Sequence, residues 1–188
     1  MQTSISTGNM KIGKTANVSI SPIKGCRKDV PCSTKCYAMK AYRCYPSARK
    51  AWDNNLLLAR TQPEVFFGDI REYLSKKQPD YFRWHVAGDI LNQNYLEEMK
   101  RIAKEYPNTQ FRCFTKRFDL DYSKMPKNLC IGFSMWPGMA VPKKLRPRFW
   151  VQDGTETRIP KNAKECTGSC IECRYCWDQK LDVWCHIH

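Results

Sequence analysis

Apolar residues recur at helical spacing in three segments of the chain. Ser47 can cap the first segment, and a second apolar face follows Pro63. In the third segment, Asn94 stands three residues before Glu97, a spacing that resembles a capping box. The apolar stripes of the three segments are Ala48, Ala51, Trp52, Leu56 and Ala59; Val65, Phe66, Ile70, Tyr73 and Leu74; and Tyr95, Leu96, Met99, Ile102 and Ala103. We expect three helices that each bury one face against a core.

Short runs of alternating apolar and polar residues predict strands. Residues 82–86 alternate in this way, and Gly88 ends the run. Similar runs cover residues 17–20, 110–115, 129–134 and 149–152. Strands that alternate with helices indicate a parallel sheet, and about five strands are too few for a closed eight-stranded barrel. We therefore expect an α/β fold, a partial, open β/α barrel with mostly parallel strands, and an open doubly wound sheet is the alternative.

Length and composition fit one domain. The chain has 188 residues, of which 42% are hydrophobic and 12% aromatic, enough to bury a core without disulfides. We see no internal linker and assign residues 1–188 to a single domain. Within it, residues 1–160 are expected to form the partial barrel and residues 161–188 a cysteine-rich extension.

The formal net charge is +14, with every cysteine counted as neutral. Thiolates bound to a metal would cancel part of this charge, and the remainder suits a basic cavity for an anionic small molecule. The densest basic run consists of Lys143, Lys144, Arg146 and Arg148, which can contact phosphates or form a solvated face. Nucleic acid is therefore another class of partner, and the aromatic residues close to basic ones are Tyr42, Tyr45, Trp136 and Trp150.

Two dense groups stand out among the 11 cysteines. The first group consists of Cys26, Cys32 and Cys36, and the second of Cys166, Cys170, Cys173 and Cys176. Loops seldom carry thiols at this density for packing reasons, whereas metal or cluster binding requires it. Disulfides are the rival interpretation, and the odd cysteine count and the lack of a signal-like apolar run in residues 1–14 argue against them. No stretch approaches a membrane span, so we expect a reducing, cytoplasmic setting and no membrane partner.

The first group has the spacing C-x5-C-x3-C, and Tyr37 follows its last cysteine. Three thiolates in one loop can hold a 4Fe-4S cluster by three irons and leave the fourth iron open. That iron can bind a small chelating ligand, or the nearby Cys44 can ligate it. Zinc is the alternative metal, but zinc sites usually take closely spaced cysteine pairs that this loop lacks.

The second group has the spacing C-x3-C-x2-C-x2-C and supplies all four ligands of one cluster. This run resembles a ferredoxin-type loop, and it lacks the spacer that two zinc knuckles need to wrap around one ion. Cys185, His186 and His188 follow closely and could replace one of the four ligands. We expect a second 4Fe-4S cluster here, with zinc as the alternative.

Polar residues follow the predicted strands at their carboxyl ends, where ligands gather in parallel α/β folds. These residues are Gly88 and Asp89, Thr115 and Lys116, Ser134, and Gln152 and Asp153. The first cysteine loop follows the first predicted strand directly, so it should lie at the same rim. His85 could also face this cavity, although a lone strand histidine is more often a core residue.

Four segments of the chain resemble the phage gene-product-eighty-eight proteins. They are GCRKDVPCSTKCYA at residues 25–38, WHVAGD at 84–89, FTKR at 114–117 and CTGSCIECRYCW at 166–177. Those proteins in turn look like compact radical S-adenosylmethionine enzymes. The resemblance implies a cluster loop formed by the first three cysteines with Tyr37 as its aromatic residue, and an auxiliary cluster in the C-terminal run. It also implies that Gly88 and Asp89 hold the amino group of S-adenosylmethionine.

Three functional classes follow from these observations. The first is a small phage radical enzyme in a host cytoplasm, with two clusters and with His85, Lys116 and Ser134 as candidate catalytic residues. The second is an iron–sulfur protein without radical chemistry, which carries electrons or binds a small ligand at the open iron. Either would need a reductase or a ferredoxin as electron donor. The third is a zinc-stabilised nucleic-acid-binding protein.

Overall fold

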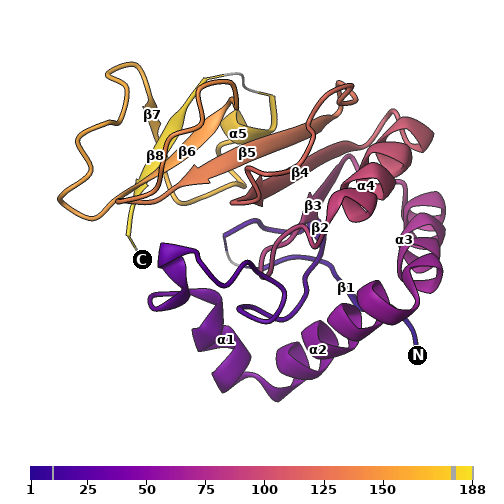
Figure 1. The fold of residues 1–188 in the computed structure, drawn as a ribbon. Helices are drawn as coiled ribbons and strands as arrows, with labels where there is room; N and C mark the ends of the chain where they lie inside the picture. Colours follow the sequence, from indigo (N-terminus) through magenta and orange to yellow (C-terminus); the bar gives the residue numbers. More distant parts are fainter. Residues whose placement is uncertain (10, 179–180, 188) are drawn as a thin grey trace.

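A mostly parallel sheet of eight strands runs through the computed structural model, which describes residues 1–9, 11–178 and 181–187 (Figure 1). The strands are β1 (Ile5–Ser6), β2 (Ala16–Val18), β3 (Tyr81–Trp84), β4 (Gln110–Thr115), β5 (Leu129–Met135), β6 (Arg148–Gln152), β7 (Lys164–Glu165) and β8 (Val183–His186). Their order in the sheet is β1-β2-β3-β4-β5-β6-β8-β7. Only the β1–β2 pair is antiparallel among these strands. The expected mixed α/β fold is thus confirmed.

The helices of the described chain are α1 (Ala38–Cys44), α2 (Pro46–Thr61), α3 (Pro63–Lys77), α4 (Gln93–Glu105) and α5 (Tyr175–Asp178), with a 3-10 turn, η1, at Pro31–Ser33. All three helices expected from periodicity are present as α2, α3 and α4. The expected cap at Ser47 is wrong, because α2 begins at Pro46, which has no N–H to satisfy and a preset φ.

The start of α4 also differs from the expected capping box. Asn92, not Asn94, caps this helix, and its side-chain oxygen accepts a hydrogen bond of 2.9 Å from the Tyr95 amide. Glu97 accepts hydrogen bonds from the side chains of Lys100 and of Gln93, the first residue of the helix. Two asparagines compete for the cap in this segment, and only the three-dimensional chain path selects one of them.

The strands lie where alternation predicted them, with small shifts at their ends. β4 has the expected bounds, whereas β3 ends at Trp84 because His85 takes a left-handed φ of 54°. The sequence missed β1 and β7, which have two residues each, and β8, which follows the second cysteine group. The sheet therefore has eight strands in the described chain, whereas the alternating runs of the sequence predicted about five.

The two faces of the sheet have different chemistry. Because successive side chains of a strand point to opposite faces, the register separates two sets of residues. One set, Phe82, Phe111 and Leu129, lies on what we call the helical face; the other, Arg83, Arg112 and Cys130, lies on the arginine face. Figure 1 shows α2, α3 and α4 on one side of the sheet and α5 on the other, where α5 packs on β4 and β5.

Aromatic side chains dominate the core on the helical face. The ring centroids of Phe67 and Tyr95 lie 4.8 Å apart, and Trp84 packs 6.3 Å from each of these rings. Burying one large apolar side chain contributes about 1.5–3 kcal/mol, so this cluster is a major source of stability for the helix layer. The basic run of the sequence is not wholly a solvated face, because Arg148 begins β6 and is 7% exposed.

The loop after β3 packs tightly against the chain that leaves β2. Gly88 has a φ of 89°, and a Cβ atom there would come within 2.2 Å of Ile20 Cγ1. The Ile20 amide donates to the Ala87 carbonyl at 3.1 Å, so these two loops are hydrogen-bonded as well. Glycine is therefore required at residue 88 for a close approach, independently of any ligand.

Replacing Gly88 with alanine should destabilise the fold by about 2 kcal/mol or more, because the variant combines an unfavourable φ with a clash. Gly68→Ala is the matched control, since Gly68 lies in α3 with open space around it. That change should stabilise the protein by about 0.5–1 kcal/mol. Urea unfolding followed by circular dichroism measures both values, and equal midpoints for the two variants would contradict this account of the loop.

Candidate functional site

The first cysteine loop folds over the carboxyl ends of β2 and β3. It leaves β2 and forms a tight turn in which the Gly25 amide donates to Ser21 and the Cys26 amide donates to Ile23. The Asp89 amide, in the loop after β3, donates to the Gly25 carbonyl at 3.0 Å. These backbone bonds fix the position of Cys26 at the rim that the sequence predicted.

The three thiols of this loop are partly buried and act on one another electrostatically. Burial raises the pKa of Cys26 to about 12, and the negative charges of Asp89 and Cys32 add to the shift. Burial also raises the pKa of Cys32, whereas the ammonium group of Lys116 lowers it and Cys36 raises it. The three cysteines therefore share one site with Lys116 and Asp89.

Asp89 joins the ends of two strands. Its carboxylate accepts hydrogen bonds from Thr115 Oγ1 at 2.6 Å, from the Lys116 amide at 2.9 Å and from the Ile90 amide at 2.7 Å. Burial raises its pKa, and Lys116 and these donors oppose that shift. Most of the acceptor capacity of the carboxylate is already used within the protein.

Tyr37 and Gly88, the other residues expected to contact a cofactor, flank the same loop. The Tyr37 hydroxyl donates to the Val86 carbonyl, which anchors the chain after Cys36 to the loop after β3. Gly88 lies against Ile20 in that loop, as described above. Both residues hold the rim together, and their contact with a cofactor stays a prediction.

Of the three candidate catalytic residues, His85 lies in the core on the helical side of the sheet. Its ring is 3% exposed on the helical side of the sheet, 5.4 Å from the ring of Tyr95, so it does not face the rim. Burial lowers its pKa to about 3, which keeps the imidazole neutral at physiological pH. Neither ring nitrogen has a hydrogen-bond partner in the described chain. Because His85 has a left-handed φ, its side chain does not follow the alternation of β3.

Lys116 and Ser134 lie closer to the rim. Lys116 has its ammonium nitrogen 5.9 Å from the centre of the Trp136 ring, and its charge acts on Cys32. Ser134 is buried near the carboxyl end of β5, on the arginine face by strand register. Lys116 is therefore the polar residue best placed to act on a ligand of the first loop.

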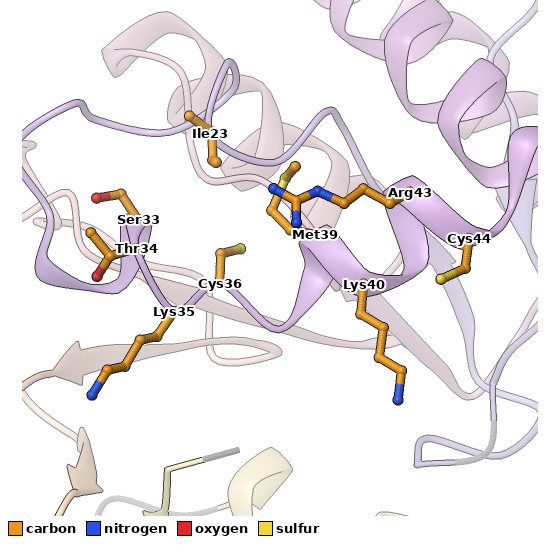
Figure 2. Close-up of a pocket in the computed structure, with 9 residues that line it drawn as sticks. All are labelled: Ile23, Ser33, Thr34, Lys35, Cys36, Met39, Lys40, Arg43 and Cys44. Atoms are coloured by element: carbon orange, nitrogen blue, oxygen red, sulfur yellow. The ribbon is translucent and has the colours of Figure 1, made fainter.

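A pocket of about 440 Å³ opens beside Cys36. Figure 2 shows Cys36 near the middle of the labelled residues and Cys44 toward one end, with Met39 and Lys40 between the two cysteines. The lining residues are Ile23, Ser33, Thr34, Lys35, Cys36, Met39, Lys40, Arg43 and Cys44. Three of these are basic and none is acidic, so the pocket favours an anionic ligand.

The four cysteines of the second group line one small cavity of about 20 Å³. Burial raises the pKa of Cys176 to about 11; Arg112 lowers it, and the charges of the other three cysteines raise it. Backbone bonds fix the loop, since the Cys166 amide donates to Trp184 at 2.7 Å and the Cys170 amide to Lys11 at 2.8 Å. All four cysteines thus line the same small cavity, and their role as a ligand set stays a prediction.

Two of the expected spare ligands near the second group differ in position. Cys185 is buried in β8, and burial raises its pKa to about 11 with a further contribution from Cys166. His186 is exposed, packs on Trp184 and lies 3.7 Å from a carboxylate oxygen of Glu165. Cys185 is therefore the better placed of the two, and His188 lies outside the described residues.

The second cysteine segment covers the amino ends of β2 and β3. Trp177 packs on Tyr81 with the ring centroids 5.1 Å apart, and the Arg174 guanidinium lies 4.0 Å from the centre of the Tyr81 ring. Arg174 also donates to Thr15 Oγ1, just before β2. The two cysteine groups therefore lie at opposite ends of the same parallel strands.

Sequence reasoning missed two buried arginines between the cysteine groups. Arg83 and Arg112 are 8% and 3% exposed, and their guanidinium carbons lie 5.1 Å and 4.2 Å from the centre of the Phe114 ring. Arg112 also donates to Cys130 Sγ on the neighbouring strand. Both arginines occupy polar positions of alternating strands, a pattern that usually means exposure.

The donor set suits an iron–sulfur cluster at either group, because soft thiolates are the ligands that such clusters take. In the described part of the chain, no three His, Cys, Asp or Glu side chains lie close enough to hold a metal ion. A cuboidal cluster binds each thiolate through a different iron, so its ligands stand farther apart than those of one ion. None of the described helices has the length and apolar character that a membrane crossing requires.

The fold and the site define an α/β protein whose parallel sheet carries a cysteine-rich loop at either end. The family model described as Gene product 88 matches residues 3–179, so the chain belongs to this phage family. Comparisons with curated proteins and with solved structures gave no match. The likeness to radical S-adenosylmethionine enzymes gains no support from these comparisons.

Thiol reactivity tests the geometry of both groups. In metal-free protein, the exposed Cys44 should react with iodoacetamide before Cys26 and Cys176, whose burial disfavours the thiolate. Because the pKa of Cys26 is raised to about 12, its alkylation rate should still increase with pH above pH 10. Mass spectrometry of timed samples gives the order, and early modification of Cys26 at neutral pH would contradict the described burial.

Proposed function

We propose that this chain is an iron–sulfur protein with one 4Fe-4S cluster in each cysteine loop. The observation that carries the proposal is a single cavity lined by all four cysteines of the second group, Cys166, Cys170, Cys173 and Cys176. Their mutual electrostatic effect on Cys176 supports the same grouping. Cys185 is the described residue best placed to substitute for one of them, because it lies close enough to Cys166 to feel its charge.

The first loop would hold its cluster through three thiolates and leave one iron open. The basic pocket beside Cys36 supports a role for that iron in binding a small anionic ligand. Cys44 also lines this pocket and is the alternative fourth ligand. Lys116, whose charge acts on Cys32, would face the same ligand.

A radical S-adenosylmethionine reaction at the open iron is the second candidate. Its support is the position of the cysteine loop, which follows the first parallel strand and contacts Asp89 in the loop after the next one. The sequential order from β2 to β6 supports the partial barrel that such enzymes use. However, Asp89 already accepts three hydrogen bonds, so an amino group of the cofactor would compete with them.

The nucleic-acid alternative has weaker support. Trp150, one of the aromatic residues proposed to stack on bases, is 1% exposed in β6. Tyr42 donates its hydroxyl to Asp53 and packs against Trp52. Tyr45 is exposed and remains suited to stacking. We therefore favour a cytoplasmic cluster protein served by a reductase or a ferredoxin.

Replacing Cys170 and Cys173 together with alanine should lower the iron content to about half and destabilise the C-terminal segment, because metal-binding free energy is also folding free energy. Cys113→Ala is the control, since Cys113 belongs to neither group and is buried on the helical face. It should keep the full iron content. Colorimetric iron analysis of protein purified without oxygen compares the iron content of the two variants. Unchanged iron in the double variant would refute the second cluster.

Ligand addition to the reduced protein separates the two chemical candidates. If S-adenosylmethionine binds the open iron, it should perturb the electron paramagnetic resonance signal and be cleaved to methionine and 5'-deoxyadenosine in the presence of dithionite. If the pocket takes anions instead, inorganic phosphate should shift the signal without cleavage. Cys32→Ala should abolish either response, and a signal that neither ligand changes would count against an open iron.

A further inference from the structure

Arg83 and Arg112 are buried cations without an anionic partner in the described chain. Each leaves its Nε–H without an acceptor, and neither forms an ion pair with a carboxylate among the described residues. A buried charge is costly unless an opposite charge and hydrogen bonds compensate it. Phe114 offers both guanidinium groups its ring face, which compensates only part of that cost.

A glycine on the neighbouring strand leaves room for the Arg112 side chain. A Cβ atom at Gly132 would come within 2.3 Å of Arg112 Nη2 and 2.8 Å of the Phe114 ring, so only glycine leaves room for the flat guanidinium. Its Nη1 lies 2.6 Å from Cys130 Sγ on the neighbouring strand. The arginine therefore lies flat across β5 instead of extending into solvent.

The two cysteine groups flank the strands that carry these arginines. Helix α5, which carries Cys176, packs on β4 and β5, and Arg112 belongs to β4 and lies across β5. The Tyr37 hydroxyl donates to the Val86 carbonyl, three residues after Arg83, and Tyr37 directly follows Cys36. Arg112 is thus covered by the segment of the second group, and Arg83 precedes the loop that anchors the first.

We propose that Arg112 and Arg83 are the buried counter-charges of the two clusters, Arg112 for the second and Arg83 for the first. This inference rests on the proposed function, because thiolate-bound clusters carry the net negative charge that the arginines would neutralise. Both are positioning residues that ligate nothing. They set how readily each cluster accepts an electron.

The electrostatic consequence has a definite sign. One-electron reduction of a cluster by an external reductant such as dithionite adds one negative charge and moves no atom between groups. A positive charge nearby stabilises the reduced form and raises the reduction potential. Removing Arg112 should therefore lower the potential of the second cluster, and removing Arg83 should lower that of the first.

Arg148 offers a matched control. It is also a buried arginine with an unpaired Nε–H, and its guanidinium lies 5.8 Å from the centre of the Trp150 ring. By strand register, however, it lies on the helical face of the sheet. Arg148→Gln therefore removes a comparable side chain without removing a charge from the arginine face.

The test is a redox titration of the cluster-loaded protein, with each cluster followed by electron paramagnetic resonance. Arg112→Gln should reduce the equilibrium constant for reduction of the second cluster about tenfold, equivalent to about 59 mV for one electron. Arg83→Gln should act mainly on the first cluster, and Arg148→Gln on neither. Arg112→Lys should keep the potential close to that of the unmodified protein because it keeps the charge.

The outcomes separate this proposal from the function on which it rests. Unmodified protein without iron would refute the clusters themselves. Loaded variants whose potentials equal that of Arg148→Gln would refute the counter-charge role alone. If Arg112→Gln fails to fold, Arg112→Lys decides: a loaded, unshifted protein supports the charge, whereas equal failure shows that the planar guanidinium is needed for packing and overturns the proposal.

Discussion

A parallel sheet must be covered on both faces, and this protein covers its two faces by different means. Helices α2, α3 and α4 bury the helical face with an aromatic core. The arginine face instead buries two cations, and α5 of the second cysteine segment packs there on β4 and β5. Hydrophobic burial can stabilise the first arrangement unaided, whereas the second needs compensation of charge. In the proposed function, the clusters would supply that compensation.

Local patterns predicted much of the fold because they report burial directly. The helical stripes beginning at Ala48 and at Tyr95 correspond to α2 and α4, and the alternation in residues 110–115 has the bounds of β4. The helix caps were harder, since Ser47 and Asn94 are good capping residues that the chain path bypasses. β8 carried little signal because it lies directly behind the cysteine run and pairs with a strand far back in the chain.

The candidate site, like the fold, could be predicted from the sequence only in part. Cysteine spacing predicted which thiols lie near one another, since the four cysteines of the second group line one cavity, and their role as cluster ligands stays a prediction. No local signal revealed Arg83 and Arg112, since an arginine at a polar strand position usually points to solvent and only the neighbouring segments bury it here. His85 was placed toward the rim by alternation, which fails where the backbone leaves the strand conformation.

Cluster binding at both cysteine groups is measured most directly by the metal and sulfide content of protein purified without oxygen. Two clusters should give brown protein with about eight irons and eight acid-labile sulfides per chain, four of each per cluster, and little zinc. Mössbauer spectra should assign the iron to cuboidal clusters. Colourless protein with stoichiometric zinc and no sulfide would contradict the account and leave a zinc-stabilised protein in its place.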